Sequence, residues 1–122
     1  MILVDIDAEA GLVVAKAIGE VTAQDYEQAL VPGLEAAIQA HGQVRMLYWF
    51  GPEFDGFSPG AVWADAEVGL KHMKDISRIA VVSDNAVISA MVSGVSLFMP
   101  MPVRVFADDR IGEANAWLVA AD

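Results

Sequence analysis

Residues 50–75 are the stretch that decides the fold, and they read FGPEFDGFSPGAVWADAEVGLKHMKD. The pattern is typical of a strand end, an irregular loop and then a helix. Ser58 followed by Pro59 favours a helix start, because a serine oxygen can accept a free backbone N–H and proline gives up a donor that has no partner there. An apolar stripe is expected along this helix from three residues at helical spacing: Trp63, Ala66 and Leu70. Since loops at the carboxyl edge of a sheet often carry function in α/β proteins, this loop is a candidate site.

The composition is that of an acidic and unusually apolar domain. The chain has 122 residues, the length of one domain, and its hydrophobic content of 56% is above the share of about half that is usual for soluble domains. A net charge of −10 argues against nucleic-acid binding and against electrostatic docking to anionic lipid, because both need clustered Lys and Arg. Without cysteine there is no disulfide, thiol nucleophile or zinc-finger spacing. The first residues lack the features of a signal peptide, so we expect a cytoplasmic protein.

Strand and helix patterns alternate along the chain. Two β-rich runs, 2–6 and 12–18, flank a short polar link and predict an antiparallel hairpin. Further strands are expected at 44–50, 75–82 and 102–106. Helices are expected from Thr22 to Gly42 with a kink at Pro32-Gly33, at 60–72, at 86–98 and from Asp108 onward. The order ββαβαβαβα predicts one α/β domain over 1–122, a mixed sheet of about five strands flanked by four helices.

Residues 86–102 break the pattern of a surface helix, because the whole run AVISAMVSGVSLFMPMP carries no charge. The run is too short, and too interrupted by Pro100 and Pro102, to span a bilayer, which takes about 20 apolar residues. A helix that is apolar almost all round is buried, paired with a partner, or laid against a ligand or lipid. Coverage by the core or a dimer mate, a ligand pocket and a membrane contact are therefore all open.

Several segments occur in an order and spacing typical of one protein family: Val21-Thr-Ala-Gln-Asp-Tyr26, Leu30-Val-Pro-Gly-Leu34, Phe57-Ser-Pro-Gly-Ala-Val-Trp63, Gly69-Leu-Lys-His72, Ile79-Ala-Val-Val82 with Asp84, and Val103-Arg-Val-Phe106. In these segments, which extend over nearly the full length, the chain resembles the SpoIIAA-like family, a branch of the STAS-like α/β fold. The resemblance implies a mixed sheet flanked by helices and a binding or regulatory role without catalysis. It also implies apolar ligand binding of the CRAL-TRIO-like kind and membrane association through helix movement.

Two features of this chain matter within the resemblance. SpoIIAA-type antagonists are phosphorylated on a serine at the start of the helix after the third strand, and Ser58 occupies the analogous place. A phosphate there would meet free amides, although Glu53 and Asp55 would repel it and a helix cap already explains the serine. Relatives usually carry charged residues in the third helix, whereas 86–98 here is apolar or hydroxylic. This departure favours lipid or dimer contact.

No arrangement typical of an active site is present in the sequence. His41 and His72 are far apart and each suits a helix end, so we expect no metal site. Asp65 and Glu67 lie two residues apart on one predicted helix and point to different faces, which does not support a carboxylate pair. We therefore expect no enzyme, no cofactor and no nucleic-acid partner.

The sequence leads to two hypotheses. The first is a non-enzymatic module that binds an apolar small molecule or lipid between the 60–72 and 86–98 helices, with peripheral membrane association as a further expectation. The residues assigned to this site are aromatic or apolar: Phe54, Phe57, Trp63, Met91, Val95 and Phe98. The alternative is a protein-interaction module, either a homodimer through 86–102 or an anti-sigma-antagonist-like partner switch at Ser58.

Overall fold

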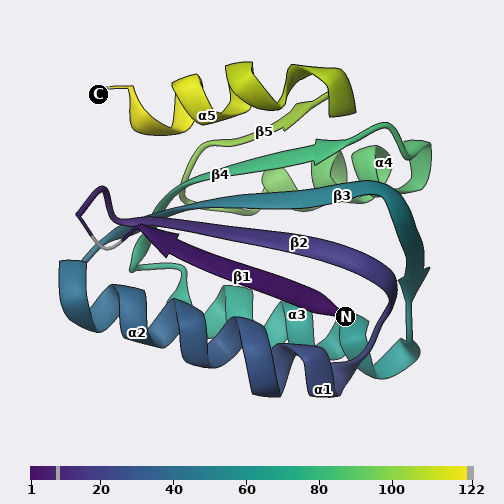
Figure 1. Cartoon of the computed structure of the whole chain (residues 1–122), viewed down its shortest axis with the longest axis horizontal. Helices are drawn as coiled ribbons and strands as arrows, with labels where there is room; N and C mark the ends of the chain where they lie inside the picture. The colour runs from purple at the N-terminus through teal and green to yellow at the C-terminus, as the bar shows by residue number, and fades with distance from the viewer. Residues whose placement is uncertain (8, 121–122) are drawn as a thin grey trace.

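The five strands form one sheet in their chain order. In the computed structural model, which describes residues 1–7 and 9–120, β1 (Ile2–Asp7) pairs antiparallel with β2 (Leu12–Val21). The remaining strands pair in parallel with β2 and with one another: β3 (Val44–Phe57), β4 (Ile76–Ser83) and β5 (Val103–Phe106) (Figure 1). The mixed α/β architecture predicted from the order of elements is confirmed.

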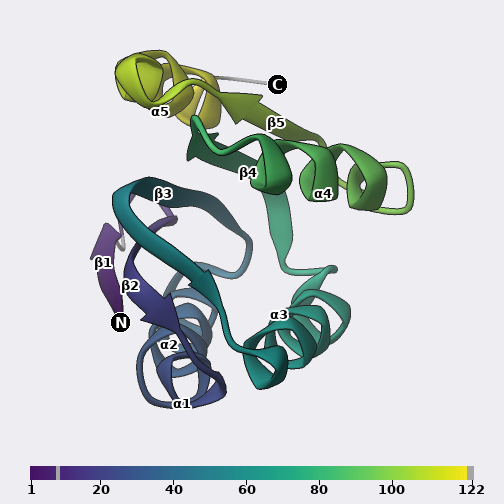
Figure 2. The same ribbon diagram turned by 90° about the vertical axis from the view of Figure 1, so that its right-hand side faces the viewer.

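Helices lie on both faces of the sheet, in unequal number. One face carries α1 (Ala23–Asp25), the π-helical turn η1 (Tyr26–Leu30), α2 (Val31–His41), α3 (Pro59–His72) and α4 (Ala86–Ser96); the other carries the 3-10 turn η2 (Asp108–Arg110) and α5 (Ile111–Val119) (Figure 2). Because side chains alternate along a strand, Tyr48 and Phe50 of β3 face the first set of helices. Leu47 points the other way and packs in the smaller cluster with Leu118 of α5.

The first helix widens into a π-helical turn just before Pro32, close to the predicted kink, and its backbone stays helical on both sides of that turn. It begins with a capping box: the Thr22 hydroxyl accepts from the Asp25 N–H at 3.3 Å, and the Asp25 carboxylate accepts from the Thr22 N–H at 2.7 Å. The wide turn η1 follows, and its closing backbone bond returns to the Tyr26 carbonyl. Tyr26 and Leu30, at the two ends of this turn, are both buried in the core.

Residues 51–57 form the second half of β3, so the irregular loop predicted for this stretch is wrong. Phe54 pairs with Gly19 and Phe57 pairs with Val21, after shifts in register. Gly19 and Gly56 have φ angles of 63° and 112°, in the region that favours glycine. Such bulges let a paired strand bend without leaving the sheet. The glycines that suggested a loop mark this bend instead.

α3 turns its small side chains inward, and the apolar stripe expected on it faces solvent. Trp63 and Leu70 are 74% and 71% exposed, whereas Ala61 is fully buried and Val68 packs partly against the core. Small residues bring this side of the helix close to α1: a Cβ added at Gly60 would lie 3.4 Å from α1. The outward-facing residues and the inward-facing residues both have helical spacing. Close packing against α1 favours the set with the smaller side chains on the inner side.

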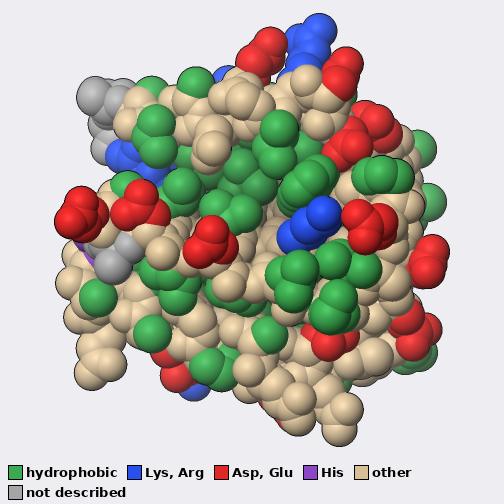
Figure 3. Space-filling view, in the orientation of Figure 1, with side chains coloured by type: hydrophobic (Ala, Val, Ile, Leu, Met, Phe, Trp, Pro, Cys, Tyr) green, Lys and Arg blue, Asp and Glu red, His purple; other side chains and the backbone are tan. Residues whose placement is uncertain are grey.

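The α5 face of the sheet has its own polar contacts. Arg45 and Arg78 donate to the carbonyl of Ala120 at 2.7 and 2.9 Å, which satisfies the C-terminal end of α5. Lys16 lies 3.4 Å from Glu53 and 4.4 Å from the centre of the Trp49 ring. Figure 3 shows acidic side chains spread over the visible face with fewer basic ones, in keeping with the net charge of −10.

Candidate functional site

A groove opens between α3 and α4. Figure 2 shows where these two helices lie relative to the sheet. The groove has a volume of about 170 Å³, its floor is formed by β3 and β4, and its lining is apolar almost throughout. Three residues that the sequence assigns to a ligand site line it: Phe57, Met91 and Val95. Phe54 packs against Phe57, with ring centroids 5.1 Å apart. The structure thus brings together residues from β3 and α4 that the sequence proposed as one site.

Three of the proposed residues lie outside this lining: Phe54, Trp63 and Phe98. Trp63 is on the outward side of α3, and Phe98 follows the end of α4 with 86% of its surface exposed. α4 also ends at Ser96, two residues before the predicted end. A ligand contact for Trp63 or Phe98 stays a prediction that the groove does not require.

α4 forms one side of the groove and packs against the core of the protein through few residues. Its one buried residue is Ile88, while Met91 and Val95 are 43% and 55% exposed although they line the groove. The start of the helix is fixed by Asn85, whose side-chain oxygen accepts from the N–H groups of Val87 and Ile88 at 2.9 and 3.3 Å. Complete burial of this helix within the chain's own core, one of the options left open by the sequence, does not occur.

Aromatic rings form the end of the groove nearest β3. Tyr48 and Phe50 stack with centroids 4.2 Å apart, and Phe50 meets Phe54 and Phe57 in edge-to-face contacts at 4.8 and 5.5 Å. The sequence placed Phe54 and Phe57 in a loop, but both pack against the main core cluster. Each of these rings therefore has an aromatic neighbour within 5.5 Å.

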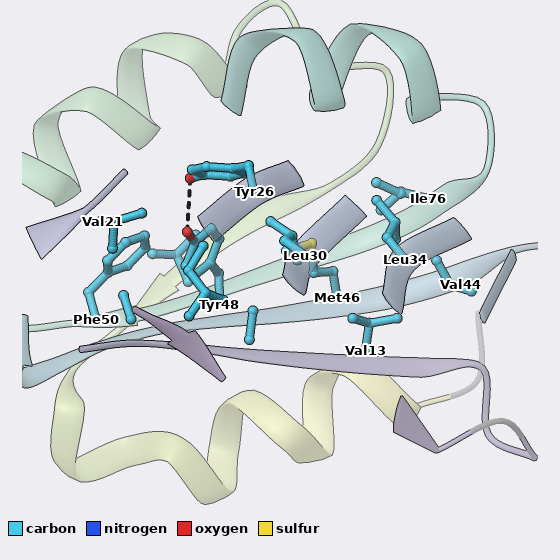
Figure 4. Packing of buried hydrophobic residues seen from close by; sticks show 14 of the residues in the cluster. Val13, Val21, Tyr26, Leu30, Leu34, Val44, Met46, Tyr48, Phe50 and Ile76 are labelled. Atoms are coloured by element: carbon cyan, nitrogen blue, oxygen red, sulfur yellow. Dashed lines mark hydrogen bonds between the residues drawn. The ribbon is translucent and has the colours of Figure 1, made fainter. Parts of the chain in front are cut away.

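A chain of hydrogen bonds crosses this apolar layer. The hydroxyl oxygens of Tyr26 and Tyr48 lie 2.8 Å apart (Figure 4), and the Tyr26 hydroxyl donates to Oδ1 of Asp65 at 3.0 Å. Because Tyr26 gives its single proton to Asp65, Tyr48 is the donor between the two tyrosines. Both tyrosines are buried, whereas Asp65 lines the groove and is open to solvent.

The ionisation of these three groups follows from their surroundings. Burial, followed by the nearby Asp65 charge, raises the pKa of Tyr26, and burial likewise raises the pKa of Tyr48. Crowding by protein atoms raises the pKa of Asp65 above its ordinary value of 3.8, partly offset by the hydrogen bond from Tyr26. Both phenols therefore stay neutral at physiological pH, and Asp65 is the member of the chain that titrates.

These hydrogen bonds among Tyr26, Tyr48 and Asp65 are not predicted from the sequence. Tyr26 falls within the predicted helix from Thr22 to Gly42 and Tyr48 within the predicted strand 44–50, and local spacing relates Asp65 only to Glu67. The available signal was the presence of two tyrosines at positions predicted to be buried, because a buried tyrosine hydroxyl needs a hydrogen-bond partner. Local spacing does not reveal which residue supplies it.

Comparison with known proteins places the fold in a family. The SpoIIAA-like family model matches residues 12–119. The chain belongs to the SpoIIAA-like family. It is 31% identical to an uncharacterized protein of the DUF3478 family from Shewanella loihica PV-4, whose crystal structure has a SpoIIAA-like fold. That match covers 97% of this chain and 92% of the other, with a TM-score of 0.75. No curated protein matches the chain.

The SpoIIAA-like fold suggests a regulatory or interaction module. Within residues 1–7 and 9–120, no three His, Asp or Glu side chains come together in a way that could hold a metal ion. Nor does that part of the chain contain a helix long and apolar enough to cross a membrane.

Ser58 of this SpoIIAA-like chain caps α3, as the sequence predicts. Its Oγ accepts from the Ala61 N–H at 3.2 Å, and its own N–H donates to the Val21 carbonyl at 2.8 Å. The side chain is only half-buried, so the hydroxyl is not sealed in the core. Its phosphorylation as a partner switch stays a prediction, and a phosphate would have to replace the cap.

Proposed function

We propose that this SpoIIAA-like module binds an apolar small molecule or lipid in the groove between α3 and α4. The observation that carries the proposal is the half-exposed lining of α4, where Met91 and Val95 face an open apolar groove instead of packed core. Removing such surface from water is favourable by about 25 cal/mol per Å². An apolar ligand in the groove would supply the contacts that the core leaves unmade.

The size and lining of the groove suit a hydrophobic guest. Apolar cavities of about 150 Å³ stay dry and take up molecules the size of benzene, and this one measures about 170 Å³ with an aromatic end. The methionines Met91 and Met99 in its lining are flexible and can adapt to irregular shapes. Because Ile88 is the one buried residue of α4, a small outward shift of the helix admits a chain longer than the cavity itself.

Fluorescence titration with N-phenyl-1-naphthylamine, a neutral apolar probe, tests the proposal. We expect the wild-type protein to enhance the probe's emission, and Met91→Asp to weaken binding about tenfold or more. The matched control is Phe98→Asp, which places the same charge in the same uncharged segment but outside the lining. Equal binding by wild type and Met91→Asp, or no binding by wild type, would overturn the proposal.

Self-association through 86–102 is a second candidate function, favoured by side chains at the end of α4. Leu97 and Phe98 are 82% and 86% exposed, and Val87 at the start of the helix is 66% exposed. Exposed apolar side chains concentrated in one segment mark contact surfaces for protein or membrane. Sedimentation velocity gives the mass of wild type and of Phe98→Asp: a dimer that dissociates in the variant supports the homodimer. A wild-type monomer that cosediments with phosphatidylcholine vesicles supports peripheral membrane contact instead.

A further inference from the structure

The polar side chains that line the groove can accept hydrogen bonds from a ligand, but their own protons are already used in hydrogen bonds within the protein. The Tyr26 hydroxyl donates to Asp65 and accepts from Tyr48, so it is fully used. Tyr48 is buried and donates its proton to Tyr26, so it has none to offer a ligand. With Asp65 ionised, its second oxygen Oδ2 is a further acceptor in the lining.

No other side chain in the lining supplies a donor. The hydroxyl of Ser96 donates to the Ser93 carbonyl at 3.0 Å. Among the described residues that line the groove there is no Lys, Arg or His, and Asp65 is the one charged group. The protein as a whole carries a net charge of −10, which adds to the negative potential around the groove.

Resting on the proposed function, we infer that the groove is selective for apolar molecules whose head group donates hydrogen bonds, a primary amine or an alcohol, over molecules with a carboxylate or phosphate head. An ammonium head offers three N–H donors to Asp65 and pairs with the charge of its carboxylate. An alcohol offers one O–H to the same carboxylate. A carboxylate head meets no donor and lies beside a like charge, so it loses hydration without compensation.

Isothermal titration calorimetry with three ligands that share one eight-carbon chain tests the inference: octylamine, octanol and octanoate. At about pH 8 the amine is cationic and octanoate anionic. We expect octylamine to bind about tenfold or more tightly than octanoate, with octanol between them. Because the three ligands share the same apolar part, differences in affinity report on the head group.

Two variants with the same change in net charge distinguish recognition of the head group in the groove from general attraction of a cation to an acidic protein. Asp65→Asn removes the charge in the lining, and we expect it to reduce the advantage of octylamine over octanoate to about threefold or less. Glu67→Gln removes a charge from the exposed side of α3, and we expect it to keep the full preference. An equal effect of both variants would show that the preference comes from the overall charge, and would overturn the inference.

The outcomes also distinguish this inference from the proposed function. Octanoate binding as tightly as octylamine, with both weakened by Met91→Asp, would overturn the head-group selectivity and leave the apolar groove intact. Failure of all three ligands and of N-phenyl-1-naphthylamine would overturn the groove as a binding site. Circular dichroism of each variant checks that the fold is retained in every comparison.

Discussion

The hydroxyl oxygens of Tyr26 and Tyr48 lie 2.8 Å apart inside the protein, one carried by the turn η1 and the other by the strand β3. Since Tyr26 also bonds to Asp65 of α3, this contact links a helical turn, a strand and a wall of the groove through polar atoms within an apolar layer. A buried hydroxyl that loses its partner pays the full cost of desolvation. Tyr26 is the middle member on which both neighbours depend.

Removing the middle hydroxyl is expected to cost more stability than removing the outer one. Tyr26→Phe leaves Tyr48 and Asp65 without their partner, so we expect the free energy of unfolding to fall by about 1–3 kcal/mol. Tyr48→Phe keeps the bond from Tyr26 to Asp65 and should cost about 1 kcal/mol or less. Urea denaturation followed by circular dichroism measures both losses. Equal losses would contradict the middle position of Tyr26 between Tyr48 and Asp65.

The raised pKa of Asp65 predicts a specific dependence of stability on pH. Between the ordinary value of 3.8 and the higher native pKa, the unfolded chain releases this proton before the folded one does. The native state then binds more protons, so Asp65 lowers the stability of the fold as pH rises through this window. Asp65→Asn lacks the effect, so its free energy of unfolding, relative to wild type, should increase from about pH 4 to pH 7.

Other titrating groups do not obscure the comparison of Asp65→Asn with wild type. Tyr26 and Tyr48, which face Asp65, stay neutral throughout the window because their pKa values are raised. Burial acts to raise the pKa of Asp25, but the hydrogen bonds from Thr22 and the N-terminal ammonium together lower it. Asp25 is present in both wild type and Asp65→Asn, so its effect cancels in the difference. Urea denaturation at a series of pH values gives the difference, with Glu67→Gln as the control variant. A difference between Asp65→Asn and wild type that is independent of pH would show that the Asp65 proton is not retained in the fold.

The order of elements could be read from the sequence because it depends on local patterns. The antiparallel hairpin and the later parallel strands follow from apolar runs and the turns between them, and the cap at Ser58 follows from its position before Pro59. The bend in β3 could not be read in this way, because Gly56 signals a turn and a bulge equally well. Pairing with β2, which is distant in the chain, decides between them.

The site was predictable only in part, for a similar reason. Phe57, Met91 and Val95 could be selected because an uncharged helix and nearby aromatic residues are visible in the sequence. The bond from Tyr26 to Asp65 joins residues 39 positions apart, which no local spacing reveals. It depends on which side of α3 faces the core, and two apolar stripes on that helix have the same period.

The observed orientation of α3 predicts that substitutions on its exposed side change stability little, whereas substitutions on its buried side lower it. Trp63 is 74% exposed, so Trp63→Ser should change the free energy of unfolding by about 0.5 kcal/mol or less. Ala61 is fully buried, so Ala61→Leu should overpack the interior and cost about 1–3 kcal/mol. Guanidinium denaturation of both variants tests this orientation. A large loss in Trp63→Ser together with a neutral Ala61→Leu would mean that the stripe expected from the sequence faces the core after all.

Two glycines within helices offer a matched test of the packing of α2 against β1. A Cβ added at Gly33 of α2 would lie 2.8 Å from Cγ1 of Val4, whereas one at Gly94 of α4 would meet nothing within 4 Å. Replacing a helical glycine by alanine gains about 0.5–1 kcal/mol where space allows. We expect this gain for Gly94→Ala and a net loss of about 1 kcal/mol or more for Gly33→Ala, because crowding exceeds the gain in helix propensity.

Adding Val4→Ala to Gly33→Ala removes the crowded atom, so the pair should recover part of the loss that Gly33→Ala alone causes. The free energies of unfolding of the two single variants and the double variant give this coupling directly. If Gly33→Ala stabilised the protein as much as Gly94→Ala, the helix would lie farther from β1 than the 2.8 Å approach requires. The tight contact would then be excluded as the reason for glycine at position 33.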